Sequence, residues 1–285
     1  MNFTAALPGL LLIALALVMF GLGLSLTVQD FGRLREHPRS VVLALVLQML
    51  VLPAVAVALI VLMDVQPIYA VGLMLLAASP GGVSANLFSH LFGGNVAMNI
   101  SLTAINTVLS IVSLPLIANW AIATYLQSGQ VVPLQFGKVL EVVGVIMVPV
   151  VIGMVVRSRR PDFSERMGPP MKVFSAVVLA VFSLIAIVKE WTALTESFSS
   201  LGPVVLAFNL ASLLVGYYLS RWAGLDKSIA TAVSFEIGIH NSTLAIFVAL
   251  SVLGNLQLAL PAALYSVSMY LTATAFGFLV LRRGG

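Results

Sequence analysis

Two interrupted polar stretches decide the fold of this chain. Residues 79–86 read SPGGVSAN, and residues 234–243 read SFEIGIHNST. Each lies inside an apolar run long enough to form a membrane-spanning helix. Pro80 removes a backbone donor, the glycines after it weaken a helix, and Glu236 brings a carboxylate into the second stretch. Because hydrocarbon offers no hydrogen-bond partners, we expect both stretches to lie inside the protein or along a wet cavity.

The composition around these stretches is that of a membrane protein. Of the 285 residues, 60% are hydrophobic and 8% are charged, whereas an average soluble domain is about 25% charged. The mean hydropathy is +1.11. These values exclude soluble enzymes and DNA-binding modules, so we expect the lipid bilayer and no nucleic acid as a partner. The absence of cysteine excludes disulfides, thiolate metal sites and thiol catalysis.

The apolar runs predict an all-α polytopic membrane protein with nine transmembrane helices. They lie at about 5–28, 40–62, 68–91, 95–126, 136–157, 170–190, 200–222, 228–254 and 257–281. The first run has no basic residues before it, so we interpret it as a retained span and not as a signal peptide. The longest loops, near 29–39 and 158–169, are too short for a soluble domain. We therefore expect residues 1–285 to form one membrane domain.

The distribution of Lys and Arg predicts the orientation. Alternating spans place all of the 14 Lys and Arg residues on one side, except Lys138 and Lys189. Basic residues gather in cytoplasmic loops. We therefore expect a multi-pass protein of the cell (inner) membrane, with its N-terminus outside and its C-terminus cytoplasmic.

The two breaks occupy corresponding positions, each in the third of four consecutive predicted spans. A unit with an odd number of spans that is repeated in tandem is inverted in the membrane. Interrupted helices at matching positions of inverted repeats point to the central site of a transporter. A Pro-Gly-Gly sequence alone is more often a simple kink, but the matching polar break favours a site.

Glu236 is the sharpest candidate for chemistry. The other acidic residues lie in loops or near helix ends, and Glu141 has Lys138 three residues away. A carboxylate buried in a membrane costs several kcal/mol unless it is paired, protonated or bound to a cation. Glu236 is therefore either a protonated structural residue, or a cation ligand or proton carrier.

A polar stripe follows one face of the predicted helix at 95–126. It consists of Asn99, Thr103, Asn106, Ser110 and Ser113, at intervals of 4, 3, 4 and 3 residues. Such residues commonly join membrane helices by hydrogen bonds, and for the last three this explanation is as good as a functional one. Asn99 and Thr103 are the better site candidates, because they are closest in sequence to the first break.

Two further polar residues have open interpretations. Gln48 is a lone amide within a span, and such residues are more often structural than ligands. His240 is either a neutral, hydrogen-bonded imidazole, or a polar ligand or titrating group. Oxygen donors of this kind suit a hard cation such as sodium, and not zinc or copper. The chain has no Walker A pattern, so active transport would have to use an ion gradient.

The chain resembles the bile acid:sodium symporter family, including its bacterial members, over essentially its whole length. The resemblance is carried by Met19 to Leu24, Phe31, His37-Pro38, Gln48 with Pro53, Pro80 to Asn86, Gly94 to Ala97, Glu236 to Gly238, and Asn241-Ser242. It implies inverted five-helix repeats, with two broken helices that cross in a core domain beside a panel domain. Core helices would lie at about 40–126 and 200–281, and panel helices at about 5–28, 136–157 and 170–190. The chain would lack the first helix of the first repeat.

The resemblance also implies site residues. The first sodium site would use Asn86, Asn99, Thr103 and Glu236, and the second would use Gln48, Glu236, Ile237, Ile239 and His240. His240 stands where a glutamine is usual, and Asn99 and Ala85 stand where serines are usual. Candidate substrate contacts are Asn86, Asn241, Ser84 and Tyr270.

The resulting hypothesis is a sodium-coupled secondary active symporter of an organic anion, bile-acid-like or a smaller carboxylate, that works by alternating access. It would have no catalytic residues and no cofactor besides sodium as the coupling ion. The alternative within the same fold is proton coupling through Glu236 and His240. Arsenite exporters share the fold but use a cysteine, which this chain lacks. An intramembrane enzyme would need a nucleophile and a base. A channel would conduct without coupling. The oligomeric state is not predicted.

Overall fold

The computed structural model describes residues 3–126 and 136–281, and their side chains except at 3–8, 136, 138, 139 and 141. In these ranges every regular element is a helix. Up to the first break these are α1 (Phe3–Ser25), α2 (Val28–Arg33), α3 (Pro38–Val46), η1 (Leu47–Val51), α4 (Leu52–Leu62) and α5 (Pro67–Ala78). Then come α6 (Ser84–Leu91), α7 (Val96–Tyr125), α8 (Phe136–Arg159), α9 (Pro161–Lys189), α10 (Trp191–Trp222) and α11 (Lys227–Gly238). The last are α12 (Ser242–Phe247), η2 (Val248–Val252), η3 (Gln257–Ala259), α13 (Leu260–Phe276) and η4 (Gly277–Leu281).

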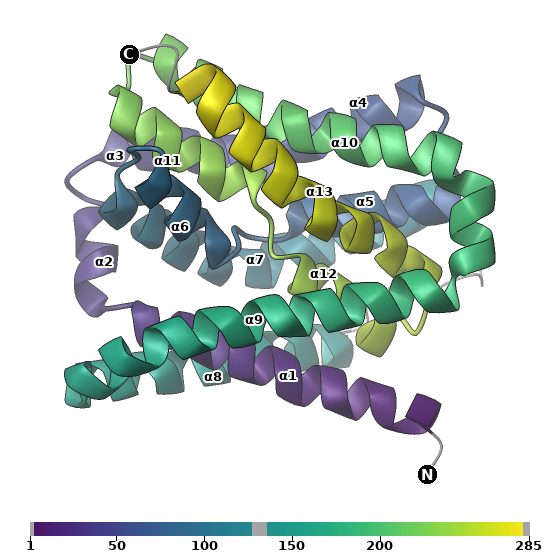
Figure 1. The fold of residues 1–285 in the computed structure, drawn as a ribbon, viewed down its shortest axis with the longest axis horizontal. Helices are drawn as coiled ribbons and strands as arrows, with labels where there is room; N and C mark the ends of the chain where they lie inside the picture. The colour runs from purple at the N-terminus through teal and green to yellow at the C-terminus, as the bar shows by residue number, and fades with distance from the viewer. Residues whose placement is uncertain (1–2, 127–135, 282–285) are drawn as a thin grey trace.

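The helices confirm an all-α membrane protein with several spans (Figure 1). Six helical segments are long and apolar enough to cross a membrane: Pro38–Leu62, Val96–Tyr125, Val142–Arg159, Pro161–Lys189, Trp191–Trp222 and Gln257–Leu281. Shorter apolar helices, Gly9–Ser25, Pro67–Ala78 and Ser242–Val252, lie within the remaining three predicted runs. The last two are short because the chain is interrupted at the two polar stretches.

The predicted loops near 29–39 and 158–169 were partly wrong. Helix α2 forms within the first, where the side chain of Asp30 accepts a hydrogen bond from the backbone N–H of Thr27 at 2.7 Å. Helix α9 begins at Pro161, a position in the first turn where a missing N–H costs nothing. Both stretches are polar and contain proline or glycine, a composition that is typical of loops. Lys138, Glu141, Arg282 and Arg283 lie outside the described side chains.

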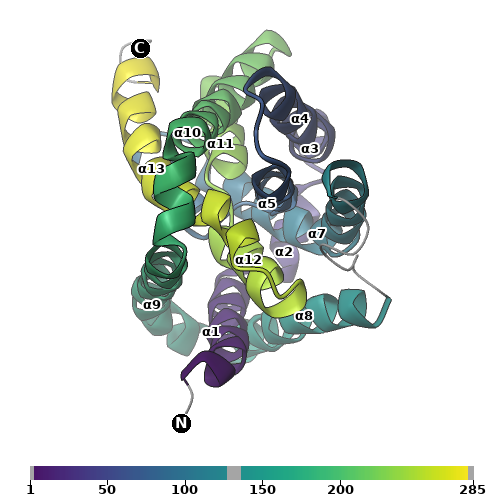
Figure 2. The ribbon, with the colours of Figure 1, turned by 90° about the vertical axis from the view of Figure 1, so that its right-hand side faces the viewer.

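Helices α1, α8 and α9 lie side by side along one side of the molecule (Figures 1 and 2). Glycines allow α1 and α8 to approach closely. A Cβ atom on Gly153 of α8 would stand 2.5 Å from the carbonyl oxygen of Phe20, and one on Gly23 of α1 would collide with the carbonyl of Val150. The glycines at the end of α1 therefore serve helix packing.

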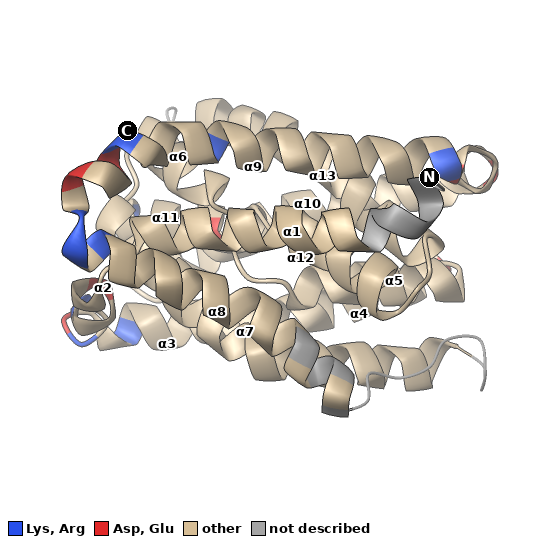
Figure 3. Ribbon diagram, turned by 90° about the horizontal axis from the view of Figure 1, so that it is seen from below, with Lys and Arg blue, Asp and Glu red and all other residues tan. Residues whose placement is uncertain are grey.

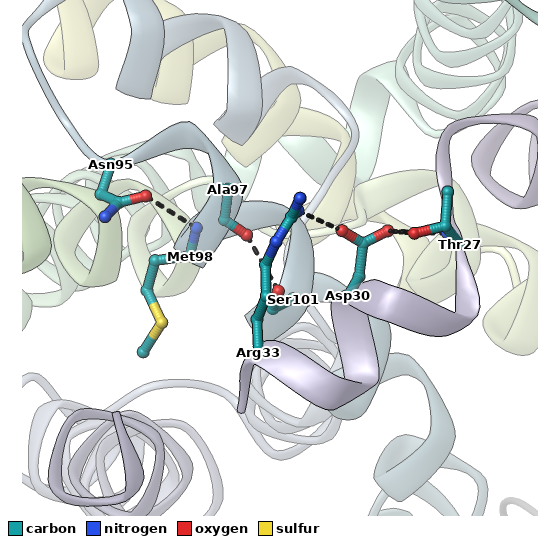
Figure 4. Close-up of polar contacts among 7 residues, drawn as sticks. All are labelled: Thr27, Asp30, Arg33, Asn95, Ala97, Met98 and Ser101. Atoms are coloured by element: carbon teal, nitrogen blue, oxygen red, sulfur yellow. Dashed lines mark hydrogen bonds and ion pairs between the residues drawn. The ribbon is translucent and has the colours of Figure 1, made fainter. Parts of the chain in front are cut away.

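The other long helices form the rest of the bundle, in which α5 packs on α7, and α10 packs on α11 and α13. Most of the described Lys and Arg residues gather at one end of this bundle (Figure 3). Helix α1 begins at the opposite end (Figure 1). The short helix α2 lies near the start of α7, and its Asp30 is also paired with Arg33 at 2.7 Å (Figure 4).

Candidate functional site

The first break separates α5 from α6. Helix α5 ends at Ala78, and the backbone is extended at Ser79, before Pro80. The Ser79 hydroxyl donates back to the carbonyl of Leu75 at 2.9 Å. The residue before a proline avoids the helical conformation. Pro80 therefore ends α5 at the polar stretch where the sequence predicts a break.

The second break separates α11 from α12, and the side chain of Asn241 caps α12 by accepting from the backbone N–H of Leu244 at 3.1 Å. The two breaks pair with each other. The N–H of Gly82 donates to the carbonyl of Ile239 at 2.6 Å, and the N–H of Asn241 donates to the carbonyl of Pro80 at 2.8 Å. Each break thus provides hydrogen-bond partners for the backbone of the other break. Hydrocarbon could not provide them.

Glu236 lies beside this crossing and has no exposed surface. Thr103 Oγ1 donates to its Oε2 at 2.5 Å, and Asn106 Nδ2 donates to its Oε1 at 3.0 Å. A Cβ on Gly81 would stand 2.5 Å from Glu236 Oε2, so only glycine leaves room for the carboxylate. None of the ion pairs among the described residues involves Glu236.

Buried amide oxygens without a hydrogen-bond partner accompany this carboxylate. Within residues 3–126 and 136–281 they are Gln48 Oε1, Asn86 Oδ1, Asn99 Oδ1 and Asn106 Oδ1. Three of these amides use their nitrogen as a donor, such as Asn99 to the carbonyl of Ala232 at 2.7 Å. An unsatisfied buried acceptor costs about 1–3 kcal/mol. The site therefore contains more oxygen acceptors than donors, which is what a hard cation needs.

Gln48 and His240 meet at the carbonyl of Ser79, in the first break. Pro53 lacks an N–H, and the preceding turn widens into the π-helical segment η1, which carries Gln48. Gln48 Nε2 donates to the carbonyl of Ser79 at 3.0 Å, and His240 Nδ1 lies 3.2 Å from the same oxygen. A carbonyl only accepts, so His240 Nδ1 is the donor in this contact, and in a neutral imidazole Nε2 is then the bare nitrogen. Nε2 is buried, with no partner among the described residues.

A narrow cleft lies between the two breaks and the helices α1 and α9. Its walls include Ser84, His240, Asn241 and Tyr270 on one side, and Val18, Ser175 and Leu179 on the other. Its volume is about 30 Å³, which is enough for very few water molecules and not for an organic anion. Ser84 Oγ and Tyr270 OH are hydrogen-bonded at 3.1 Å.

The structure brings many of the predicted residues together. Thr103 contacts Glu236, and Asn99 lies one turn before Thr103 on α7. Ser84, Asn241 and Tyr270 line the cleft. Asn86 is buried on α6 and is not among the residues that line the cleft. Ile239 gives its carbonyl to Gly82, and Ile237 is buried in α11.

Two residues were missed from the predicted site. The polar stripe included Asn106, but nothing in it showed that this amide, and not Ser110, faces Glu236. Tyr265 carries no signal in the sequence. Its hydroxyl donates to the carbonyl of Gly238 at 2.8 Å, and its ring lies 5.4 Å from that of His240.

These features define a class: an all-helical, multi-span membrane protein with a buried polar centre where two broken helices meet, as in secondary transporters. The sequence model of the Sodium Bile acid symporter family matches residues 12–197, and the chain belongs to this family. It is therefore related to sodium-dependent transporters and not to enzymes.

Named relatives agree with this membership. The chain is 27% identical over 273 residues to the "Probable sodium/metabolite cotransporter BASS2, chloroplastic" of Oryza sativa subsp. japonica, covering 95% of this chain and 64% of the relative. It is 27% identical over 261 residues to the "Uncharacterized sodium-dependent transporter YocS" of Bacillus subtilis (strain 168), covering 90% and 78%. It is 31% identical over 237 residues to the "P3 protein" of Mus musculus, covering 79% and 47%. The chain thus spans less than two thirds of the plant relative.

Proposed function

We propose that the protein is a sodium-coupled symporter of an organic anion. The observation that carries this proposal is the buried Glu236 carboxylate, which has no cationic partner in the described chain and is accompanied by unpartnered amide oxygens. Sodium supplies the missing positive charge and accepts neutral oxygen ligands. The family membership and the names of the two sodium-dependent relatives point to the same ion.

The two proposed sodium sites share Glu236. The first uses Asn86, Asn99 and Thr103, and the unpartnered oxygens of both asparagines support it. The second uses Gln48, His240 and the backbone of Ile237 and Ile239. It is supported by Gln48 Oε1, which is buried and unpartnered, and by the shared contact of Gln48 and His240 with Ser79.

The proposed anion site is the cleft. Asn241 uses its oxygen to cap α12, so its amide N–H groups are left as donors to a carboxylate or sulfonate. The hydroxyls of Ser84 and Tyr270 are further donors. Because the cleft has little volume, the anion can enter only when α1 and α9 move away from the breaks. Asn86 does not line the cleft, and its proposed role is to order the first break by binding sodium. This role replaces the expectation that Asn86 contacts the substrate directly.

The proposed movement separates a core from a panel. The panel consists of α1, α8 and α9, and their close packing supports its motion as a unit. The core consists of α3–α7 and α10–α13. We further propose nine spans in inverted repeats, in an inner membrane, with the Lys- and Arg-rich end cytoplasmic. The predicted orientation with the N-terminus outside follows from that end.

Proton coupling through Glu236 and His240 receives less support. Glu236 accepts hydrogen bonds from Thr103 and Asn106, whereas His240 contacts the carbonyl of Ser79. No hydrogen bond joins the two side chains in the part of the chain that the structure describes. Uptake driven by a pH gradient without sodium would nevertheless favour this alternative.

The thermal stability of the purified protein in sodium, compared with choline or potassium, tests the proposal. A ligand that binds only the folded state stabilises it by RT ln(1 + [L]/Kd), which is about 1.4 kcal/mol at ten times the Kd. We expect a sodium-specific rise in Tm, and a further rise when an organic anion that is carried is added in sodium. Equal melting temperatures in all three salts would contradict the proposal.

A further inference from the structure

A regular row of contacts joins α7 to α11 between Glu236 and one end of the bundle. From the surface inward, the pairs are Asn95 with Ser228 (2.9 Å), Asn99 with Ala232 (2.7 Å) and Thr103 with Glu236 (2.5 Å). The members are four residues apart on each helix, which corresponds to a rise of about 6 Å per pair. Ser228 is exposed and Glu236 is fully buried. The row thus leads from the surface to the proposed sodium site.

Buried oxygens without partners lie along this row. They are Asn86 Oδ1 and Ser89 Oγ on α6, Asn99 Oδ1 on α7, and Thr231 Oγ1 on α11, and the three helices pack against one another. Ser89 and Asn99 have no exposed surface, and Thr231 is 1% exposed. Both Ser89 and Thr231 lie against Gly94, where a Cβ would stand 3.1 Å from Thr231 Cγ2 and would collide with Ser89 Oγ.

Hydrogen bonds within their own helices do not account for these two hydroxyls. Serine and threonine in membrane helices usually donate to a carbonyl one turn earlier. On α7, Ser101 donates to Ala97 at 2.9 Å and Thr107 donates to Thr103 at 2.7 Å. Ser89 and Thr231 make no such bond among the described residues. Their oxygens are available to a transient ligand.

We propose that these oxygens line the path by which the coupling cation passes between Glu236 and the surface at the start of α7 and α11. The inference rests on the proposed function, because it concerns where the sodium of that function leaves. Neutral oxygens replace the water around a cation one at a time, and they hold it weakly enough for it to leave. The path opens at the turn after α6, where Gly93 is exposed and has φ 75°. Asn95 is the N-cap of α7 there, and its side chain accepts a hydrogen bond from the backbone N–H of Met98 (Figure 4).

The absence of native cysteine makes the path directly testable. Ser89→Cys and Thr231→Cys each place a thiol on the proposed path. Ser212→Cys is the matched control, because Ser212 is equally buried but donates to the carbonyl of Phe208 on α10, a helix that contributes no residue to the path. Each variant, in sealed vesicles of either orientation, is treated on one side with the small cationic reagent methanethiosulfonate ethylammonium or its anionic sulfonate analogue. A thiol quencher is kept inside, and modification is measured by intact-protein mass spectrometry.

We expect Ser89→Cys and Thr231→Cys to be modified by the cationic reagent from the Lys- and Arg-rich side at least about tenfold faster than Ser212→Cys. The anionic reagent should react much more slowly at both positions. Modification no faster than at Ser212→Cys, or equal rates with the two reagents, would overturn the path.

The sodium-dependent Tm rise of the unsubstituted protein, measured in parallel, separates the two ideas. If the rise is present but the path thiols do not react, the path is wrong and the proposed function stands. If the rise is absent, the proposed function fails, and the path fails with it. Ser89→Ala and Thr231→Val should keep the Tm rise, because neither side chain is a ligand at Glu236.

Discussion

Replacing Gly81 with alanine tests the geometry of the centre. The new Cβ would stand 2.5 Å from Glu236 Oε2, roughly 1 Å closer than ordinary van der Waals contact. Two outcomes are sterically possible. Either the carboxylate stays and the folded state is strained, or it moves away from Thr103 and Asn106 and the cation loses its charged ligand. Overpacking of this kind costs about 1–3 kcal/mol, which corresponds to about 5- to 150-fold in sodium affinity if all of it falls on binding.

The assay is thermal denaturation of the purified Gly81→Ala variant in sodium and in choline. Gly144→Ala is the control, because nothing lies within 4 Å of a Cβ at that position of α8. We expect the sodium-dependent rise in Tm to shrink or disappear in Gly81→Ala and to persist in Gly144→Ala. A Gly81→Ala protein with the melting temperature and the full sodium response of the parent would refute the reasoning.

Three other variants probe separate parts of the account. Asn106→Ala removes a donor to the buried carboxylate, so we expect about 1–3 kcal/mol lower stability and weaker sodium stabilisation in the same thermal assay; unchanged values would exclude a role at the centre. Gly153→Val forces α1 from α8, so we expect a lower Tm in every salt but an intact sodium-dependent rise, and loss of that rise would mean that the panel shapes the ion site. His240→Gln can keep a donor to Ser79 and adds an oxygen, so we expect a steeper dependence of Tm on sodium concentration, whereas an unchanged curve would argue against His240 at the second site.

The two breaks were predictable because their signals are local. Proline, paired glycines and a carboxylate within apolar runs are incompatible with a plain lipid-facing helix. The candidate status of Glu236 follows from the same argument. The pairing of Gly82 with Ile239 is not local, since it depends on how two distant segments cross.

The role of Asn106 could not be predicted, because five polar residues share one face of α7. The register of α7 against α11 decides which of them contacts Glu236. This register cannot be deduced from the sequence of either helix alone. The first turns of α9 and α10 were not predicted as helix, for another reason. The predicted runs began at about 170 and 200, whereas the helices begin at Pro161 and Trp191. The polar residues at the start of both helices, and Pro161 at the start of α9, resemble a loop in a hydropathy pattern, although a proline in the first turn is compatible with a helix.

Direct binding of radioactive sodium to the purified protein, at equilibrium and in competition with unlabelled sodium and choline, tests the central claim that Glu236 holds the coupling ion. The comparison is between the parent protein and Glu236→Gln, which keeps the shape of the side chain but removes its charge. The account predicts saturable binding that unlabelled sodium displaces and choline does not, and its loss in Glu236→Gln. Equal sodium binding by the two proteins, with both folded, would contradict it.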